Sequence, residues 1–449
     1  MKIFFSGIGG SGVSALAGFA AAKGHTVAGS DRLFDNDPQH PLISTLTRSG
    51  IRLAPQNGEG IDPSCDLAVF STAIEESNPD LIQARASGVS IRTRPEYLAE
   101  LVGQFRTIAV AGTSGKSTTS GMLAFLMQRL GMSPGFIGGG RVKQFRTAAN
   151  PGNYSAGNSD ILVIEACESD GSIVNYRPEH SIIANLQLDH HSVAETSRMF
   201  ELLAGHTSGL VITGGDDRNL AACSISNQVK YSINTGSAYR AADIIYQRFS
   251  SQFTVGGQHF SLSLPGEHNL YNALACIALL AEMGIPLQRI AELLPEFSGI
   301  ERRFDIHLND GSHLVVDDYA HNPHKIASLM RTMQGISERI CYIFQPHGFG
   351  PTRMMKDGYI NVFSRYLRET DRLLLLPIYY AGGTAAQDIS SADIAGPLRS
   401  AGRSAAALQS RAGIFEAPLE EHAFVVLGAR DDSLSVLAEE IARSLQAAS

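Results

Sequence analysis

The chain has 449 residues, of which 44% are apolar and 18% are charged, and its formal net charge at pH 7 is −8. At roughly 150 residues per domain, this length predicts about three domains. The negative charge argues against nucleic acid or an anionic membrane as a partner and leaves small anionic ligands open, and no apolar run approaches the ~20 residues of a membrane helix.

The N-terminus and the cysteines predict a cytoplasmic protein. The start MKIFFSGIGG lacks the basic segment and long apolar stretch of a signal peptide. No C-x-x-C pair occurs among the five cysteines, which argues against a disulfide framework and a structural zinc site. These cysteines are Cys65, Cys167, Cys223, Cys276 and Cys341.

Residues 1–103 are predicted to form a parallel α/β domain. A strand at 2–6 leads into a glycine turn, and a helix closes on Gly24 before the next strand. The turn, Gly7 to Gly12, satisfies the G-x-G-x-x-G pattern, and Asp31 lies roughly 20 residues on. A nicotinamide-dependent oxidoreductase is therefore one hypothesis.

The second predicted domain, residues 104–298, begins with another strand, glycine loop and helix. The loop Gly112-Thr113-Ser114-Gly115-Lys116-Ser117 has the context of a phosphate-binding loop, in which Lys116 contacts phosphates and the Ser117 hydroxyl ligates Mg²⁺. The chain has only seven lysines, so a lysine here is not compositional noise. Because position 110 is Val, the loop is shorter than the usual G-x-x-x-x-G-K-[ST] pattern.

Two strand ends in this domain offer hard ligands for a divalent metal. Acidic residues and imidazoles after buried strands, close to a phosphate loop, are typical of sites for a metal-bound nucleotide. The candidates are Glu165, Glu168 and Asp170 after the first strand and Asn185, Asp189, His190 and His191 after the next.

The third predicted domain, residues 299–449, alternates strand-like and helical segments from HLVVDDYAHNP to HAFVVLGA. Several ordered motifs then resemble the Mur ligase family. They are GTSGKSTT (112–119), EACESD (165–170), NLQLDHH (185–191), GEHNLYNALA (266–275), FSGIERRFD (297–305), DDYAHNP (317–323) and FQPH (344–347). The resemblance implies an α/β fold with a Rossmann-like N-terminal domain, a P-loop-type central ATPase domain and a Rossmann-like C-terminal domain.

Members of this family are ATP-dependent ligases of peptidoglycan precursor synthesis that form an amide through an acyl phosphate. The N-terminal motifs most resemble the branch that joins L-alanine to the lactyl carboxylate of UDP-N-acetylmuramate. Alternatives are the sister branch that recycles murein tripeptides and a divergent ligase with another amine. The resemblance implies ATP and Mg²⁺ as cofactors and a monomer or homodimer, without nucleic-acid or membrane partners.

The resemblance also assigns roles residue by residue. The implied catalytic residues are Lys116, Glu165, His190, Tyr319 and His321, and the implied metal ligands are Ser117, Glu165 and His190. The implied ATP contacts are Gly112, Thr113, Ser114, Gly115, Lys116, Ser117, Thr118, His268, Asn269, Asn272, Arg303 and Asp317. The implied contacts with the UDP-sugar are Gly9, Gly10, Ser11, Gly12, Ser71, Ala73, Ile74, Arg94 and Glu96. On this reading the first glycine turn holds a UDP pyrophosphate, and Asp31 is only a possible neighbour of the sugar nucleotide.

The chain departs from the family pattern mainly where the amine would bind. Gly348 and Pro351 stand where the alanine-adding branch carries two arginines, and Arg353 follows two positions later. LGARDDSL replaces a glycine-rich loop, and Cys167 replaces an acid. No lysine lies between positions 143 and 230, so the carbamoylated lysine of some relatives has no counterpart there. A non-catalytic nucleotide-binding regulator therefore remains a third hypothesis.

Overall fold

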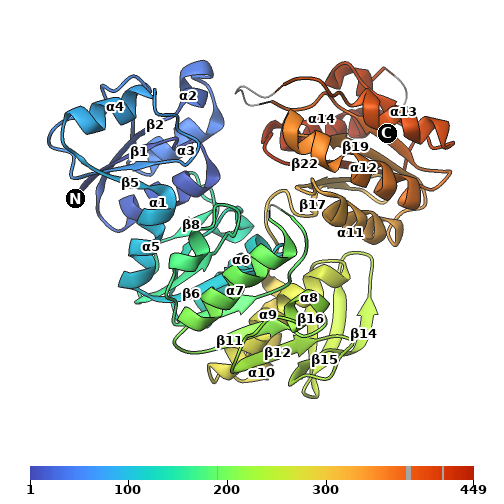
Figure 1. The fold of residues 1–449 in the computed structure, drawn as a ribbon. Coiled ribbons are helices and arrows are strands. Elements are labelled where there is room, and N and C mark those ends of the chain that lie inside the picture. Colours follow the sequence, from blue (N-terminus) through green and yellow to red (C-terminus); the bar gives the residue numbers. More distant parts are fainter. Residues whose placement is uncertain (190, 381–385, 417–418, 449) are drawn as a thin grey trace. The chain divides into compact units, whose positions relative to one another are not determined.

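The computed structural model describes residues 1–189, 191–380, 386–416 and 419–448, and the chain divides into two compact units. The first unit spans residues 1–300 and the second spans residues 301–449. Both are built from sheets of mainly parallel strands joined by helices, so the predicted α/β class is confirmed. Figure 1 shows the elements in chain order.

The first sheet of unit 1 has five parallel strands in the order β3-β2-β1-β4-β5. Its order reverses at β1, where the glycine turn follows. The elements are β1 (Lys2–Ser6), α1 (Ser11–Ala22), β2 (Thr26–Ser30), α2 (Arg32–Asn36), α3 (Pro41–Arg48), β3 (Arg52–Leu53), β4 (Leu67–Phe70), α4 (Pro79–Ala86), β5 (Ser90–Thr93) and α5 (Arg94–Gln104).

The second sheet of unit 1 has eight strands in the order β13-β12-β11-β10-β6-β9-β7-β8, and only the β7–β8 pair is antiparallel. Its elements are β6 (Arg106–Ala111), α6 (Lys116–Arg129), β7 (Gly135–Ile137), β8 (Tyr154–Ser155), β9 (Ile161–Glu165), β10 (His180–Ile183), α7 (Val193–His206), β11 (Val211–Gly214), α8 (Arg218–Ala221), β12 (Gln228–Ser232) and β13 (Tyr239–Arg240).

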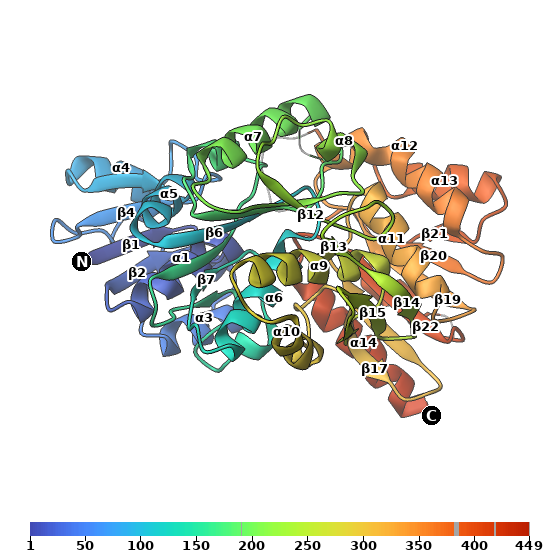
Figure 2. The ribbon, with the colours of Figure 1, turned by 90° about the horizontal axis from the view of Figure 1, so that it is seen from below.

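A small antiparallel sheet and two helices complete unit 1 (Figure 2). Strand β16 of that sheet packs against α10. The elements are β14 (Ala242–Tyr246), β15 (Ser251–Val255), β16 (Gln258–Leu262), α9 (Glu267–Glu282) and α10 (Leu287–Leu293). Helix α9 is buried along most of its length, which explains its almost uninterrupted apolar sequence.

The two larger sheets of unit 1 share one hydrophobic core through α1. Gly18 in α1 has no room for a side chain, because an added Cβ atom would collide with the ring of Tyr154 in β8. Phe19, one residue on, lies against Gly135 at the start of β7. We propose that residues 1–103 and 104–298 are distinct domains of this unit, each with its own sheet.

Unit 2 contains a six-stranded sheet in the order β17-β18-β22-β19-β20-β21, in which only β17 is antiparallel. Strand β22 therefore lies between β18 and β19. The elements are β17 (Asp305–Asn309), β18 (Leu314–Asp318), α11 (Pro323–Gln334), β19 (Ile340–Gln345), α12 (Phe349–Tyr366), β20 (Arg372–Leu375), α13 (Ala392–Ser400), β21 (Ala405–Ala407), β22 (Ala423–Gly428) and α14 (Ser433–Ala448).

Short 3₁₀ helices occur at Lys143–Phe145, Ser172–Asn175, Leu294–Glu296 and Arg411–Ile414. Among the described residues, no helix is both long enough and apolar enough to cross a membrane.

Candidate active site

The predicted phosphate loop lies between β6, a buried central strand, and the N-terminus of α6. Gly112 and Gly115 have φ values of +137° and +83°, which L side chains rarely adopt. A Cβ atom at Gly115 would also collide with Oδ1 of Asn272. The loop therefore needs glycine at both positions, and it leads directly into the N-terminus of α6, which favours anions.

Asn185, after β10, holds the loop in shape. Its Oδ1 accepts hydrogen bonds from the Thr113 hydroxyl and the Ser114 backbone N–H, both at 2.9 Å, and its Nδ2 donates to the Ser114 carbonyl at 2.9 Å. The Asn185 side chain thus makes three hydrogen bonds with two loop residues, and these bonds fix the conformation of the phosphate loop.

Lys116 is the first residue of α6, and its ammonium group is enclosed. Nζ donates to the Gly112 carbonyl at 2.7 Å and to Oε2 of Glu168 at 2.8 Å, and Glu168 is only 1% exposed. Burial favours a lower pKa for Lys116, but Glu168, with Cys167 and Glu165, outweighs it and raises the pKa. Lys116 is therefore a fixed positive charge beside the loop.

The other oxygen of Glu168 is buried and has no hydrogen-bond partner among the described residues. A buried carboxylate oxygen without a donor is costly. The described residues therefore do not fully satisfy the carboxylate of the Lys116–Glu168 pair.

Ser117 and Glu165 bring two hard oxygen ligands together. The Ser117 hydroxyl donates to Oε1 of Glu165 at 3.1 Å, and the Gly139 N–H donates to Oε2 of the same carboxylate at 2.8 Å. His190, the third predicted metal ligand, lies outside the described residues. Among the described residues, no group of three or more His, Cys, Asp or Glu side chains is arranged around a metal position.

Helix α9 contributes the predicted adenine-side residues. The Asn272 Oδ1 accepts from the Thr119 hydroxyl of α6 at 3.1 Å, and Asn269 Nδ2 donates to the Pro265 carbonyl at 2.8 Å. His268 is exposed at the N-terminus of this helix. Asn269 and Asn272 are both 5% exposed, so their structural hydrogen bonds position this helix end beside the loop.

In the first sheet, the glycine turn is closed by Asp31. Its Oδ2 accepts from the Gly9 N–H at 2.7 Å, and its Oδ1 accepts from the Leu33 N–H at 2.8 Å, which caps α2. Each carboxylate oxygen of Asp31 thus accepts one backbone hydrogen bond, so Asp31 shapes the turn as well as capping α2.

The other predicted UDP-sugar residues surround the same turn. An added Cβ atom at Gly12 would lie 3.3 Å from Cδ of Arg94, and Arg94 forms an ion pair with Asp170 in the turn after β9. The Ser71 hydroxyl accepts from the Ala73 N–H at 3.3 Å, and the Ile74 N–H donates to the Ser71 carbonyl at 3.1 Å. Glu96 accepts from the Thr93 N–H at 2.7 Å and caps its own helix α5.

In unit 2, Asp317 and Arg302 form a buried ion pair, with 3.1 Å between Oδ2 and Nε. Arg302 also donates to the carbonyls of Gly428 and Asp431 at 2.9 and 3.0 Å. Burial raises the pKa of Asp317 to about 7, although Arg302 pulls it down. Asp317 is completely buried, so its carboxylate is a structural partner of Arg302 as the protein stands.

The residues predicted near the reacting groups gather where β18 and β19 end. The ring of Tyr319 lies 5.6 Å from that of His321, which in turn lies 5.3 Å from His347. The Arg303 guanidinium lies 4.7 Å from the centre of the Tyr319 ring. The Tyr359 hydroxyl donates to the His321 carbonyl at 2.7 Å and fixes the loop.

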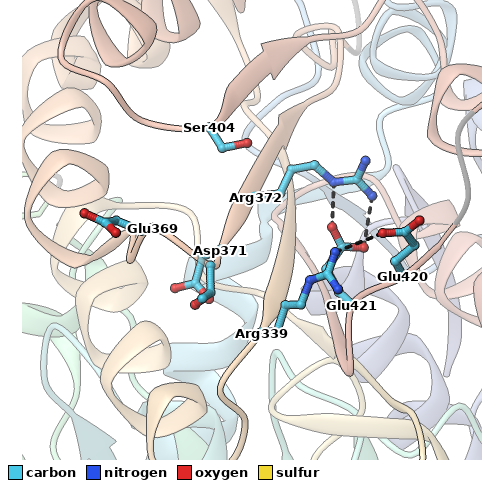
Figure 3. A pocket seen from close by; sticks show the side chains of 8 residues that line it. Arg339, Glu369, Asp371, Arg372, Ser404, Glu420 and Glu421 are labelled. Carbon is cyan, nitrogen blue, oxygen red and sulfur yellow. Dashed lines mark hydrogen bonds and ion pairs between the residues drawn. The ribbon is translucent and has the colours of Figure 1, made fainter.

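A pocket of about 380 Å³ opens at the other end of the same sheet, where β19, β20 and β22 begin (Figure 3). Two ion pairs lie in it: Arg372 lies 2.8 Å from Glu421 and Arg339 lies 3.1 Å from Glu420. Ligands of parallel sheets bind at the carboxyl ends of the strands, so this pocket is not the predicted site.

Several residues that position the site had no such role in the sequence analysis. Asn185 and Glu168 were named as candidate metal ligands, whereas in the structure Asn185 bonds the loop and Glu168 bonds Lys116, and Gly139 follows a strand in the run GFIGGG. Arg302 was passed over in favour of its neighbour Arg303. A polar residue directly after a buried strand was the available signal for the first two, whereas nothing local distinguishes Arg302.

Three profiles of known families match the chain in succession. Residues 2–106 match the catalytic domain of the Mur ligase family, residues 110–280 match the Mur ligase middle domain, and residues 302–431 match the Mur ligase glutamate ligase domain.

Two curated relatives and two solved structures are similar over most of their lengths. The UDP-N-acetylmuramate–L-alanine ligase of Syntrophotalea carbinolica is 33% identical over 85% of this chain and 84% of its own. That of Caldicellulosiruptor saccharolyticus is 30% identical over 89% of each chain. The crystal structure of the UDP-N-acetylmuramate-alanine ligase of Thermotoga maritima has a TM-score of 0.83 and 28% identity over both full chains. A murein peptide ligase from Psychrobacter arcticus, 22% identical with a TM-score of 0.72 over 99% of this chain and 98% of its own, shares the fold.

Proposed function

Because the chain belongs to the Mur ligase family, we propose that it joins the amino group of L-alanine to the lactyl carboxylate of UDP-N-acetylmuramate. The family makes it an ATP-dependent, amide-forming ligase with three α/β domains. The specific substrates rest on the curated relatives, which are named for this reaction.

One observation carries the ATP-dependent half of the proposal: Lys116, Ser117 and Glu165 meet at one phosphate loop. Lys116 would hold the transferring phosphoryl group, and the loop N–H groups would bind the remaining phosphate oxygens. Transfer of the γ-phosphoryl group to the carboxylate yields an acyl phosphate and ADP. The amine then attacks the carbonyl carbon, phosphate leaves with the C–O bond electrons, and the nitrogen loses a proton.

The donor set at this loop fits Mg²⁺. The Ser117 hydroxyl and the Glu165 carboxylate are hard oxygen ligands, and the Gly139 N–H holds the far carboxylate oxygen so that the near one faces Ser117. Ser117, Glu165 and His190 would hold the ion, which neutralises phosphate charge when bound. Glu168 would keep Lys116 in place until nucleotide arrives.

In unit 2, Tyr319 and His321 would line the amine side, and Arg303 would reach the nucleotide. In unit 1 the turn from Gly9 to Gly12 would hold the UDP pyrophosphate, and Ser71, Ala73 and Ile74 would line the uridine. Arg94 would lie close by. The family motifs support each of these roles.

A ligase assay tests the proposal. Purified protein with ATP, Mg²⁺ and UDP-N-acetylmuramate is expected to release phosphate when L-alanine is added, with the amide product detected by mass. Lys116→Ala should abolish turnover. A lack of phosphate release with every amine in an amino-acid panel would refute the substrate assignment.

The panel should include a murein tripeptide, because the chain lacks arginine at positions 348 and 351, where α12 begins. Turnover of the tripeptide in preference to alanine would move the chain to the recycling branch while leaving the ATP chemistry unchanged.

A further inference from the structure

Arg430 lies directly beyond β22, the strand between β18 and β19, and it has an uncommon backbone conformation. Its φ is +70°, in the left-handed region that favours glycine. Non-glycine residues held there concentrate at functional sites, because something in the surrounding structure or function must compensate for the strain. The strained backbone of Arg430 therefore indicates a functional role for its side chain.

The backbone of Arg430 is anchored beside the predicted amine side. Its N–H donates to the Tyr319 hydroxyl at 3.3 Å. Burial and two nearby aspartates raise the pKa of the Tyr379 phenol. Arg430 is close enough to Tyr379 to oppose this rise. Tyr379 pairs with His347 through a β-bridge, and the Tyr379 carbonyl accepts from the Gly348 N–H at 2.8 Å. Arg430 thus lies among the residues that follow β18, β19 and β22.

The other arginines around these strand ends are engaged. Arg302 is buried against Asp317, Arg411 lies 2.7 Å from Asp431, and Arg353 pairs with Asp388 on the surface. Arg303 packs over the Tyr319 ring. The Arg430 guanidinium is exposed and makes no hydrogen bond or ion pair with any described residue. No described carboxylate forms an ion pair with the Arg430 guanidinium, although Asp431 and Asp432 follow it in the chain.

We propose that Arg430 is a specificity-determining residue whose guanidinium binds the α-carboxylate of the incoming amino acid. This inference rests on the proposed function and deepens it. An α-amino acid carries a carboxylate next to its reacting amine, and a planar guanidinium binds a carboxylate through two parallel hydrogen bonds. The substrate class is therefore a free amino acid, because the first carboxyl group of a peptide is already an amide.

Steady-state kinetics of the full chain test this inference. With ATP and UDP-N-acetylmuramate saturating, R430G and R430A should raise KM for L-alanine about tenfold or more, as expected for losing a charged hydrogen bond. The KM values for ATP and UDP-N-acetylmuramate should not change, and R430K should recover part of the loss. R399A removes an equally exposed arginine from α13 and serves as the matched control.

L-Alaninamide supplies the chemical control, because it lacks the carboxylate. The wild-type enzyme should use alaninamide poorly, and R430G should discriminate little between alanine and alaninamide. The thermal midpoint of R430G should equal or exceed that of the wild type, since glycine accepts this φ without strain. Lower activity in R430G therefore cannot be ascribed to misfolding.

Two outcomes would overturn the inference while the proposed function stands. They are an unchanged KM for alanine in R430G, and equal use of alanine and alaninamide by the wild type. Absence of turnover with every amine in the wild type would overturn the proposed function and this inference together.

Discussion

The Lys116–Glu168 pair couples the stability of unit 1 to its chemistry. Both groups are enclosed, and the second oxygen of Glu168 has no donor within the part of the chain that the structure describes. Removing one member of a buried ion pair leaves an uncompensated charge, which costs about 3–5 kcal/mol. Lys116→Met should therefore lower the free energy of unfolding, measured by chemical denaturation, by about 3 kcal/mol. The same substitution should also abolish turnover.

The double variant Lys116→Met/Glu168→Gln is the matched control. It removes the orphaned carboxylate, so it should recover most of the lost free energy of unfolding while turnover stays absent. If the single and double variants were equally unstable, the ion pair would not account for the loss.

At the residue scale, the sequence predicted the residues that would contact the ligand but not the residues that position them. Lys116 and Ser117 were identifiable because their chemistry depends on a local glycine pattern. Arg302 and Arg303 are adjacent and identical in kind, and only the fold shows that Arg302 is buried against Asp317. The other partners of Arg302 are the carbonyls of Gly428 and Asp431, more than 100 positions away, so no local pattern indicates them.

At the scale of elements, the junction between β6 and α6 depends on the backbone conformation of Gly115 and on its lack of a side chain. Gly115 and Gly131 have nearly the same φ, +83° and +82°, at the two ends of α6. A Cβ atom at Gly115 would collide with Asn272, whereas an added Cβ at Gly131 would meet no heavy atom within 4 Å. Alanine at either position would be strained by the positive φ, but only alanine at Gly115 would also collide with a neighbour. Comparing the two substitutions therefore separates the cost of backbone strain from the cost of the collision.

Gly131→Ala should therefore cost about 1 kcal/mol, the penalty for a left-handed alanine, with KM for ATP unchanged. Gly115→Ala should cost more and raise KM for ATP at least about tenfold, because Asn272 or the loop must move. Denaturation and ATP-dependence kinetics of the two variants measure both effects. Equal losses of stability and equal KM values would show that the contact with Asn272 is unimportant.

The elements themselves were largely predictable, because apolar runs and glycine turns are local. The alternation of strand and helix predicted the parallel sheets, and the strand predicted at 2–6 corresponds to β1. The antiparallel sheet of β14 to β16 was not predicted, because β14 is largely exposed and lacks an apolar pattern. The placement of β22 between β18 and β19 is a long-range pairing, and it alone brings Arg430 to the site.

At the scale of the whole molecule, the two units have separate hydrophobic cores. The cores of unit 1 contain Phe5, Leu162 and Leu274, and that of unit 2 contains Val315, Ile343 and Phe424. The phosphate loop lies entirely in unit 1, whereas Tyr319 and Arg430 lie in unit 2. A ligand of the loop should therefore stabilise one unit directly.

Calorimetry of the full chain is expected to resolve two transitions, and Lys116→Met identifies the transition of unit 1 because it lowers only that one. A non-hydrolysable ATP analogue with Mg²⁺, at about 100 times its dissociation constant, should stabilise unit 1 by about 2.7 kcal/mol. For a unit of this size that is a rise of roughly 4 °C in the thermal midpoint. The Lys116→Met variant should show a much smaller rise, because a phosphate contact is missing. If the analogue raised the midpoint equally in the wild type and in this variant, the nucleotide would bind elsewhere than at the loop.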